Sequence, residues 1–311
     1  MLVYAYGDGL AVLWQAASQA GRPKYWKPSL QIAGLLITFG LPLWQFGQAY
    51  PPRRLEALYG QPLDIWRQTL KTGNQGERLA SGLESLPSNA VVISDWEQMT
   101  ILWYYQDVEG RRPDVELVYP VERLKDFTAG ERDVCLARNL PVGPEWHPTS
   151  AGALACLQRK ATLTAPEQAT PVGTALYTPE GQAVLELAGY QIEGDVYAAG
   201  RYAPVVLTWR ALTNVADDYA ISLHILDEQW QPVWAQDIAA PVLGMYPTSR
   251  WMMGEVVQDY HEFALPRQMP PARYLWTVVV YRQLADGSFL QLRDQQGNVE
   301  ILGGTFEVTP R

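Results

Sequence analysis

Two acidic side chains, Asp95 and Glu97, directly follow a short apolar run at 90–94 that is typical of a buried strand. Open α/β sheets usually bind their ligands where such strands end. Asp95 and Glu97 are therefore substrate-binding candidates. The same two residues also suit the start of a helix, with Asp95 as the N-cap and Glu97 beside the positive end of the helix dipole. The sequence leaves both interpretations open.

A second group of candidates, Tyr246, Trp251 and Glu255, lies in a long segment between two predicted strands. Aromatic and acidic side chains on the loops of a β-sandwich can stack on sugar rings and hydrogen-bond to them. The alternative is that these side chains pack over the open end of the sandwich. We treat all three as candidates for binding a substrate.

Cys135 and Cys156 are the only cysteines, and the three histidines lie far apart in the sequence. Without a CxxC pair, this pattern does not predict a zinc site. Both cysteines fall in predicted strands of one small sheet, so we expect them to lie close enough for a disulfide. Two buried free thiols are the alternative. His224 falls on the more polar face of its predicted strand, which indicates an exposed residue rather than a ligand.

Signatures of cofactor binding or of a catalytic nucleophile are missing from the sequence. Gly7-Asp8-Gly9 is not followed by the Lys-Ser/Thr pair of a phosphate-binding loop, and no strand leads into it. We also find no serine elbow and no paired histidine ligands. The sequence therefore predicts no catalytic residue, no metal and no cofactor.

The elements that position Asp95 and Glu97 are predicted to form a small α/β domain over residues 51–161. After the strand at 90–94 come an apolar helix at 97–108 and strands at 115–119, 133–137 and 151–157. Strand, crossover helix and strand in succession indicate parallel pairing. Because the helix is apolar nearly all round, we expect it to be sandwiched between layers.

Residues 162–182 have no hydrophobic periodicity and are rich in Thr, Pro, Ala and Gly, which marks a linker. Beyond it, residues 183–311 alternate with a period of two. Val205, Leu207 and Trp209 are spaced in this way. About eight such runs, separated by turn residues, predict an antiparallel β-sandwich.

No charged residue occurs between Lys27 and Arg53. The predominantly apolar stretch within these bounds is long enough to cross a bilayer, which takes about 20 residues of helix. We therefore predict a transmembrane helix at 29–50 with lipid contact through 29–49, after a partial or re-entrant segment at 1–28. The alternative is a buried core helix. Small residues in the span would allow packing against other membrane helices or subunits.

The charge and aromatic composition narrow the range of partners. A net charge of -9 without a basic stripe argues against nucleic-acid binding. The aromatic residues are mostly the amphipathic types, with twelve Trp and seventeen Tyr against six Phe. Such side chains suit membrane interfaces, sandwich cores and sugar-facing surfaces. A glycan is therefore a candidate partner. The predicted fold class is α/β plus all-β: one transmembrane helix, a small parallel-sheet α/β domain, and an antiparallel β-sandwich.

Segments 95–97, 102–106 and 108–115 resemble the soluble region of bacterial membrane proteins similar to the protein O-mannosyltransferase family and its relatives of unknown function. Segment 241–255 looks like a C-terminal β domain that some of these proteins carry. The resemblance covers roughly residues 29–311. It implies a glycosyltransferase-like membrane protein, but no position matches the catalytic acidic motif of that family.

The resemblance implies an extracytoplasmic C-terminal module that binds or positions a glycan or a protein acceptor and has no catalytic site of its own. The alternative is a non-catalytic, membrane-anchored structural subunit of a larger assembly. In either case we expect the protein at a membrane with its soluble region extracytoplasmic, and we expect no glycosyl transfer by this chain alone.

Overall fold

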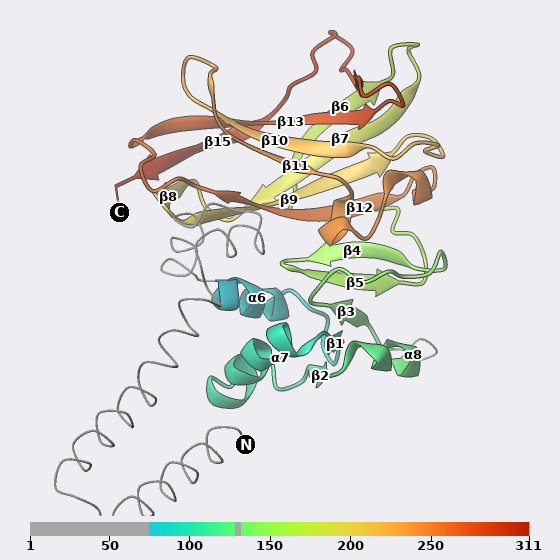
Figure 1. The fold of residues 1–311 in the computed structure, drawn as a ribbon, viewed down its shortest axis with the longest axis vertical. Coiled ribbons are helices and arrows are strands. Elements are labelled where there is room, and N and C mark those ends of the chain that lie inside the picture. The colour runs from blue at the N-terminus through green and yellow to red at the C-terminus, as the bar shows by residue number, and fades with distance from the viewer. Residues whose placement is uncertain (1–74, 128–131, 311) are drawn as a thin grey trace, which may run out of the picture. The chain divides into compact units, whose positions relative to one another are not determined.

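The computed structural model describes residues 75–127 and 132–310; helices predominate in the first range and strands in the second (Figure 1). One part is a small sheet with helices, and the other is a larger pair of sheets. Both belong to one unit by their contacts, Asn74–Arg311. The predicted membrane segments at 1–28 and 29–50 lie outside the described residues.

The small sheet has five strands in the order β2-β1-β3-β5-β4. Strand β1 pairs in parallel with β2 and β3, whereas β5 pairs antiparallel with β3 and β4. The strands are β1 (Val91–Ile93), β2 (Glu116–Val118), β3 (Val134–Leu136), β4 (His147–Ala151) and β5 (Leu154–Gln158). The segment expected to add one last strand forms a hairpin instead, with Gly152 in its turn at φ 54°.

Short helices accompany this sheet. They are α6 (Gln75–Glu84), α7 (Trp96–Trp103), the π-helix η2 (Tyr104–Val108), the 3-10 helix η3 (Val121–Arg123) and α8 (Leu124–Phe127). The helix predicted at 97–108 corresponds to α7 and η2; it buries Met99 and Leu102, but Tyr104 and Val108 are 52% and 69% exposed. The expectation that this helix is enclosed between layers is therefore wrong, because apolar side chains also occupy its solvent-facing side.

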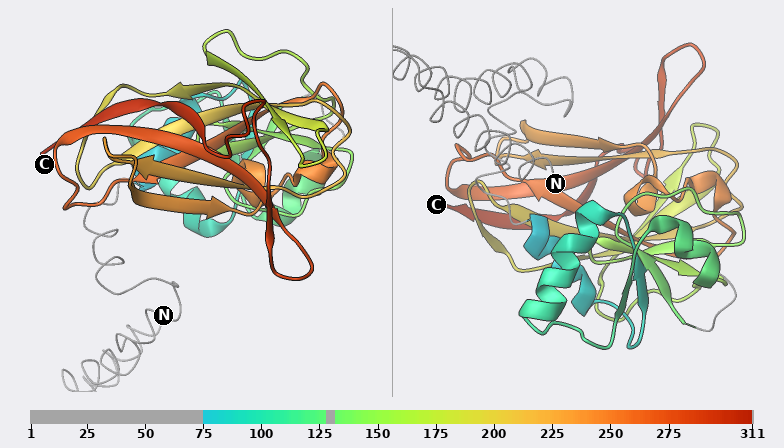
Figure 2. Two further views of the ribbon diagram at one scale, coloured as in Figure 1. Left: turned by 90° about the horizontal axis from the view of Figure 1, so that it is seen from above. Right: turned by 60° about the horizontal axis from the view of Figure 1, so that its bottom comes forward.

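The two faces of the small sheet enter different cores. Val92 and Cys135 pack with Leu83 and Leu102 from the helices, whereas Ile93 and other alternate residues join the core of the larger part. This explains the continuous apolar runs of β1 and β3, since a strand covered on both faces has no polar side. The small sheet is thus a middle layer between helices and sandwich (Figures 1 and 2).

The larger part consists of two facing sheets. One is four-stranded, in the order β12-β9-β7-β6, and the other follows β11-β10-β13-β15-β8 with β14 added beside β13. The strands are β6 (Thr170–Tyr177), β7 (Ala183–Ile192), β8 (Val196–Ala198), β9 (Tyr202–Ala211), β10 (Ala220–Leu226), β11 (Pro232–Ile238), β12 (Val256–Ala264), β13 (Ala272–Gln283), β14 (Phe289–Gln291) and β15 (Ile301–Thr309). Two short helices, α9 (Pro241–Gly244) and η4 (Thr248–Arg250), precede β12.

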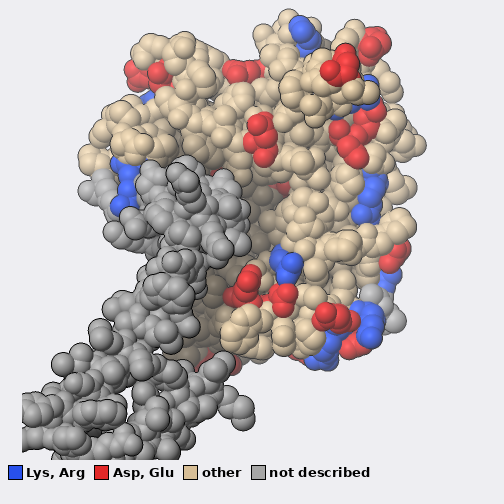
Figure 3. Space-filling model, in the orientation of Figure 1, with Lys and Arg blue, Asp and Glu red and all other residues tan. Residues whose placement is uncertain are grey.

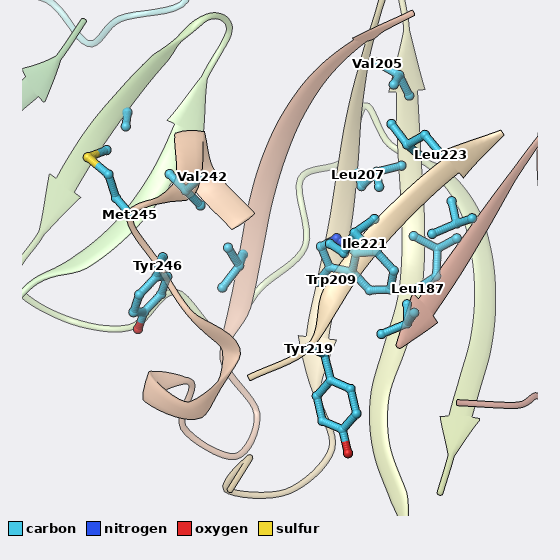
Figure 4. Close-up of a cluster of buried hydrophobic side chains, with 14 of the residues drawn as sticks. Leu187, Val205, Leu207, Trp209, Tyr219, Ile221, Leu223, Val242, Met245 and Tyr246 are labelled. Atoms are coloured by element: carbon cyan, nitrogen blue, oxygen red, sulfur yellow. The ribbon is translucent and has the colours of Figure 1, made fainter. Parts of the chain in front are cut away.

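Apolar side chains from the period-two pattern of the sequence fill the space between the two sheets. Leu207 and Trp209 from β9 meet Ile221 and Leu223 from β10, and all four are buried (Figure 4). Burying an aliphatic or aromatic side chain of this size contributes about 2 kcal/mol relative to leaving it exposed.

The small sheet is attached to the sandwich at the edge strand β12. The backbone N–H of Gln258 donates to the hydroxyl of Thr149 at 3.2 Å, and that of Tyr260 donates to the hydroxyl of Ser150 at 3.0 Å. An edge strand leaves backbone groups unpaired. Here the side chains of β4 satisfy two of them, which joins β4 to β12 without a continuous sheet.

The predicted fold class needs correction. The small sheet is mixed rather than parallel, because β4 and β5 form a hairpin beside β3. The sandwich is not wholly antiparallel, since β8 pairs in parallel with β15. Strand β6 lies within the segment expected as a linker. Across residues 75–127 and 132–310, no helix is long and apolar enough to cross a membrane.

Candidate functional site

The carboxyl ends of β1, β2 and β3 meet at one edge of the small sheet. The N–H of Ser94 donates to the carbonyl of Val118 at 3.3 Å, and the N–H of Ala137 donates to the carbonyl of Ile93 at 3.3 Å. These bonds hold the residues that follow each strand side by side. In open α/β sheets this edge, where neighbouring strands diverge in chain order, is the usual place for a ligand.

Asp95 makes two contacts at this edge. One carboxylate oxygen accepts from the N–H of Trp96 at 2.9 Å and caps α7, and the other lies 2.7 Å from Nη1 of Arg138. The side chains of Arg138 and Asp95 are 40% and 42% exposed. The capping interpretation and the binding interpretation are therefore compatible, because the ion pair remains open to solvent.

Exposed aromatic rings accompany this ion pair. Trp96, the first residue of α7, is 61% exposed, and Tyr119, directly after β2, is 45% exposed. Glu97 is also exposed, in the first turn of the helix. Aromatic side chains at the same sheet edge as a carboxylate and a guanidinium offer both stacking and hydrogen bonds to a ligand bound there. We call Asp95, Trp96, Tyr119 and Arg138 the edge cluster.

Tyr246, Trp251 and Glu255 come together in a different place, and all are buried, with exposed fractions of 1%, 2% and 1%. One oxygen of Glu255 accepts from the Tyr246 hydroxyl at 2.8 Å, and the other accepts from the N–H of Met252 at 3.0 Å. The indole N–H of Trp251 donates to the carbonyl of Tyr246 at 3.3 Å. The Glu255 carboxylate is thus buried among protein hydrogen-bond donors.

His147 of β4 completes this buried cluster. Its Nδ1 lies 3.0 Å from the carboxylate of Glu255 and 2.9 Å from the hydroxyl of Tyr246. Burial, reinforced by the Glu255 carboxylate, raises the pKa of the Tyr246 phenol well above its ordinary value. His147 was not predicted as a site residue, because its contact with Glu255 spans 108 residues and leaves no spacing pattern in the local sequence.

The buried cluster has no free aromatic face on which a sugar ring could stack. It links β4 of the small sheet to the segment before β12, and Figure 4 shows Tyr246 beside the sandwich core. Within this conformation, its chemistry is that of an internal hydrogen-bond network. We call Tyr246, Trp251, Glu255 and His147 the buried cluster.

A left-handed turn lies next to the buried cluster. Val242 and Leu243 have φ values of 55° and 57°, which are costly for side chains with a Cβ, at about 1–3 kcal/mol each. The N–H of Val242 donates to Asp259 at 2.7 Å, and the other oxygen of Asp259 lies 2.6 Å from Nε2 of His261. Asp259 is fully buried. This pair holds the turn against the sandwich.

Cys135 and Cys156 face each other in the register of β3 and β5 and form a disulfide. The bond lies between the small sheet and its covering helices, in the core that contains Leu83 and Met99. Among the described residues, no group of three or more His, Cys, Asp or Glu side chains could hold a metal ion.

Comparisons with known proteins add little to this geometry. No protein-family model and no curated protein matches the sequence. Similar solved structures include the C-terminal domain of wzt, at 11% identity and a TM-score of 0.33, covering 48% of this chain and 90% of that one. A Niemann-Pick type C2 protein from the Japanese carpenter ant has 7% identity and a TM-score of 0.27, covering 47% of this chain and 100% of that one. Similarities at this level carry no argument.

Proposed function

We propose that residues 74–311 form a binding module that holds a glycan, or a glycan-bearing acceptor, at the edge cluster and has no glycosyl-transfer site. The observation that supports this most is the exposure of Trp96 and Tyr119 at the same sheet edge as the open Asp95–Arg138 ion pair. Sugar rings present C–H faces that stack on aromatic rings, and hydroxyls that bond to charged side chains.

The surroundings of the edge cluster favour a neutral or weakly charged ligand over a polyanion. Asp95 is already paired with Arg138, so the two side chains together carry no net charge. On the face of the molecule in Figure 3, acidic and basic side chains are scattered among uncharged ones. Neither feature suits a nucleic acid, whose binding relies on an excess of Lys and Arg.

We further propose an extracytoplasmic location for the module. The Cys135–Cys156 disulfide supports it, since disulfides persist mainly in oxidising compartments outside the cytosol. The proposed role in a glycosyltransferase-like membrane protein rests on the sequence resemblance alone.

The test compares two exposed tryptophans in the purified full-length chain. Trp96→Ala removes the ring from the edge cluster, whereas Trp230→Ala removes a ring of similar exposure, 55% against 61%, from a turn of the sandwich. The probe is a glycan array, followed by titration calorimetry with the best ligand. We expect at least a tenfold loss of affinity for Trp96→Ala and for Arg138→Gln, and no loss for Trp230→Ala. Equal effects of the two tryptophan variants, or no glycan binding at all, would refute the proposal.

A structural role is the second candidate function, and the buried cluster favours it. Its hydrogen bonds hold the small sheet and the sandwich together as one unit. A subunit that serves as a rigid spacer in an assembly would need this linkage and no ligand. Retention of a partner in pull-downs by the Trp96→Ala and Arg138→Gln variants, with no glycan bound, would favour this alternative.

A further inference from the structure

The outer face of the sandwich carries a hydrogen-bonded chain of Ser222, His224 and Glu300. The Ser222 hydroxyl lies 3.0 Å from Nε2 of His224, and Nδ1 of the same ring lies 3.1 Å from the Glu300 carboxylate. A nucleophile, a base and a group that orients the base stand in this order in enzymes that activate serine. These three side chains lie apart from both the edge cluster and the buried cluster.

The strand geometry places these groups on one face. Strand β10 is central in its sheet, with β11 and β13 on either side, and its alternate residues Ile221, Leu223 and Ile225 fill the core. Ser222 and His224 are two residues apart, so both point to the opposite face. Glu300 reaches them from the residue directly before β15.

In a neutral His224 ring, the carboxylate of Glu300 selects which nitrogen carries the proton. An ionised Glu300 only accepts, so Nδ1 of His224 must donate to it. Nε2 then carries the lone pair and accepts the proton of the Ser222 hydroxyl. This is the tautomer that a general base requires, and Glu300 selects it.

The Glu300 end of this hydrogen-bonded series is open to solvent, whereas Ser222 is buried. Ser222 is 4% exposed, and the side chains of His224 and Glu300 are 23% and 37% exposed. Thr277 lies directly opposite His224 on β13, and its buried hydroxyl has no hydrogen-bond partner. Ser222 itself pairs with Val279, so Thr277 is its diagonal neighbour on the same face of the sheet. A donor left unused on this face can bond to an oxyanion that forms nearby.

We propose that Ser222 is a nucleophile toward carboxylic esters, with His224 as its base and Glu300 as the positioning residue. The Ser222 oxygen bonds to the ester carbon while its proton passes to Nε2 of His224. The C–O bond to the alcohol then breaks, and His224 returns the proton to the departing alkoxide. Water, deprotonated by the same nitrogen, releases the acid and restores the serine.

Turnover should be slow, because the backbone N–H groups of β10 are committed to the strands on both sides. Thr277 is then the one donor that we assign to the oxyanion, in place of the pair of backbone donors common in fast serine hydrolases. Formation of a covalent acyl or phosphonyl adduct on Ser222 is therefore a more sensitive measure of its reactivity than steady-state hydrolysis.

The test treats the folded full-length chain with a fluorophosphonate probe, in which the serine oxygen displaces fluoride from phosphorus. Mass spectrometry locates the adduct and times its formation. We expect the adduct on Ser222, its absence in Ser222→Ala, and a rate at least 100-fold lower in His224→Gln, in line with the usual contribution of a general base. Glu300→Gln should slow labelling about tenfold, Glu300→Asp should restore most of it, and Thr277→Val should slow it.

Ser288→Ala is the matched control, because the Ser288 hydroxyl bonds to the carboxylate of Asp286 without an intervening histidine. It should label at the unaltered rate. Thermal unfolding curves identify any variant that fails to fold, and the rates of the folded variants then decide. No adduct on Ser222 of the folded chain, or equal labelling rates in His224→Gln and the unaltered protein, would overturn the proposal.

Discussion

The edge cluster and the buried cluster are built from the same residue types, aromatic rings with carboxylates and a basic side chain, but they differ in exposure. Trp96 is 61% exposed, whereas Trp251 is 2% exposed. The Asp95 carboxylate shares its contacts with solvent, and that of Glu255 is enclosed by protein donors. The difference teaches that residue type alone does not separate a binding surface from an internal network. The burial of the side chains decides whether a ligand can reach them.

This comparison predicts that mutations in the two clusters act on different quantities. In the buried cluster, removing one partner leaves others buried and unpaired, which costs free energy of unfolding. In the edge cluster, water can replace a lost partner, so stability changes little while ligand affinity falls. The following variants test this division in order of decreasing effect.

The largest effect is expected for Glu255→Ala. The Tyr246 hydroxyl, the N–H of Met252 and Nδ1 of His147 each lose a hydrogen-bond partner, the charged carboxylate of Glu255. Hydrogen bonds to charged groups contribute about 1.5–3 kcal/mol each, so we expect a loss of about 3 kcal/mol or more in the free energy of unfolding. Urea denaturation measures it. Glu97→Ala is the exposed control and should change the stability by less than about 0.5 kcal/mol. Similar losses for both variants would break the comparison.

Removing the disulfide should have the next largest effect. The double variant Cys135→Ala/Cys156→Ala opens a loop with a sequence separation of 21 residues. Loop-closure entropy predicts a loss of about 3 kcal/mol, and the empty sulfur volume in the core of Leu83 and Met99 adds to it. Urea denaturation with and without reductant measures the loss. Reductant should destabilise the unaltered protein and leave the double variant unchanged.

Asp95→Ala should have a smaller effect on stability. The variant loses the N-cap bond to Trp96, for which about 1 kcal/mol is typical. Asp95→Asn keeps an acceptor for the cap but gives up the charge that pairs with Arg138. We therefore expect Asp95→Asn to be nearly as stable as the unaltered protein but to bind the glycan as weakly as Asp95→Ala. If Asp95→Asn has both the stability and the glycan affinity of the unaltered protein, the ion pair is not part of the binding surface.

Local chemistry in the sequence was enough to predict some features of the structure. The apolar run at 90–94 predicted β1, Asp95 does cap the helix that follows, and the alternation in 205–209 predicted a core-facing strand. These features depend on neighbours within a few residues. Their physical causes, side-chain period and capping, are visible in the sequence itself.

Contacts between distant segments were not predictable in this way. The hairpin of β4 and β5 turns a parallel sheet into a mixed one. The sequence of β4, with Thr149 and Ser150, gives no sign that these hydroxyls will bond to β12. His147 meets Glu255 for the same reason. His224 was expected to be an exposed residue of its strand, and only the fold shows Glu300 beside it. Such partners depend on topology rather than on spacing.

The smallest effect is expected for Asp114→Asn, at an ion pair before β2 in which the carboxylate of Asp114 is exposed. The guanidinium of Arg112 and the N–H of Asn89 hold the pKa of Asp114 well below its usual range. Because this pKa is lowered in the folded protein, the contribution to stability is present above the ordinary carboxyl pKa, about 4, and is lost as the pH falls through the folded value. Solvent screens the pair, so the loss at pH 7 should be smaller than for Asp95→Ala. The difference in unfolding free energy between Asp114→Asn and the unaltered protein should shrink steadily below about pH 4. A difference that stays constant down to about pH 2 would show that the substitution alters packing rather than charge.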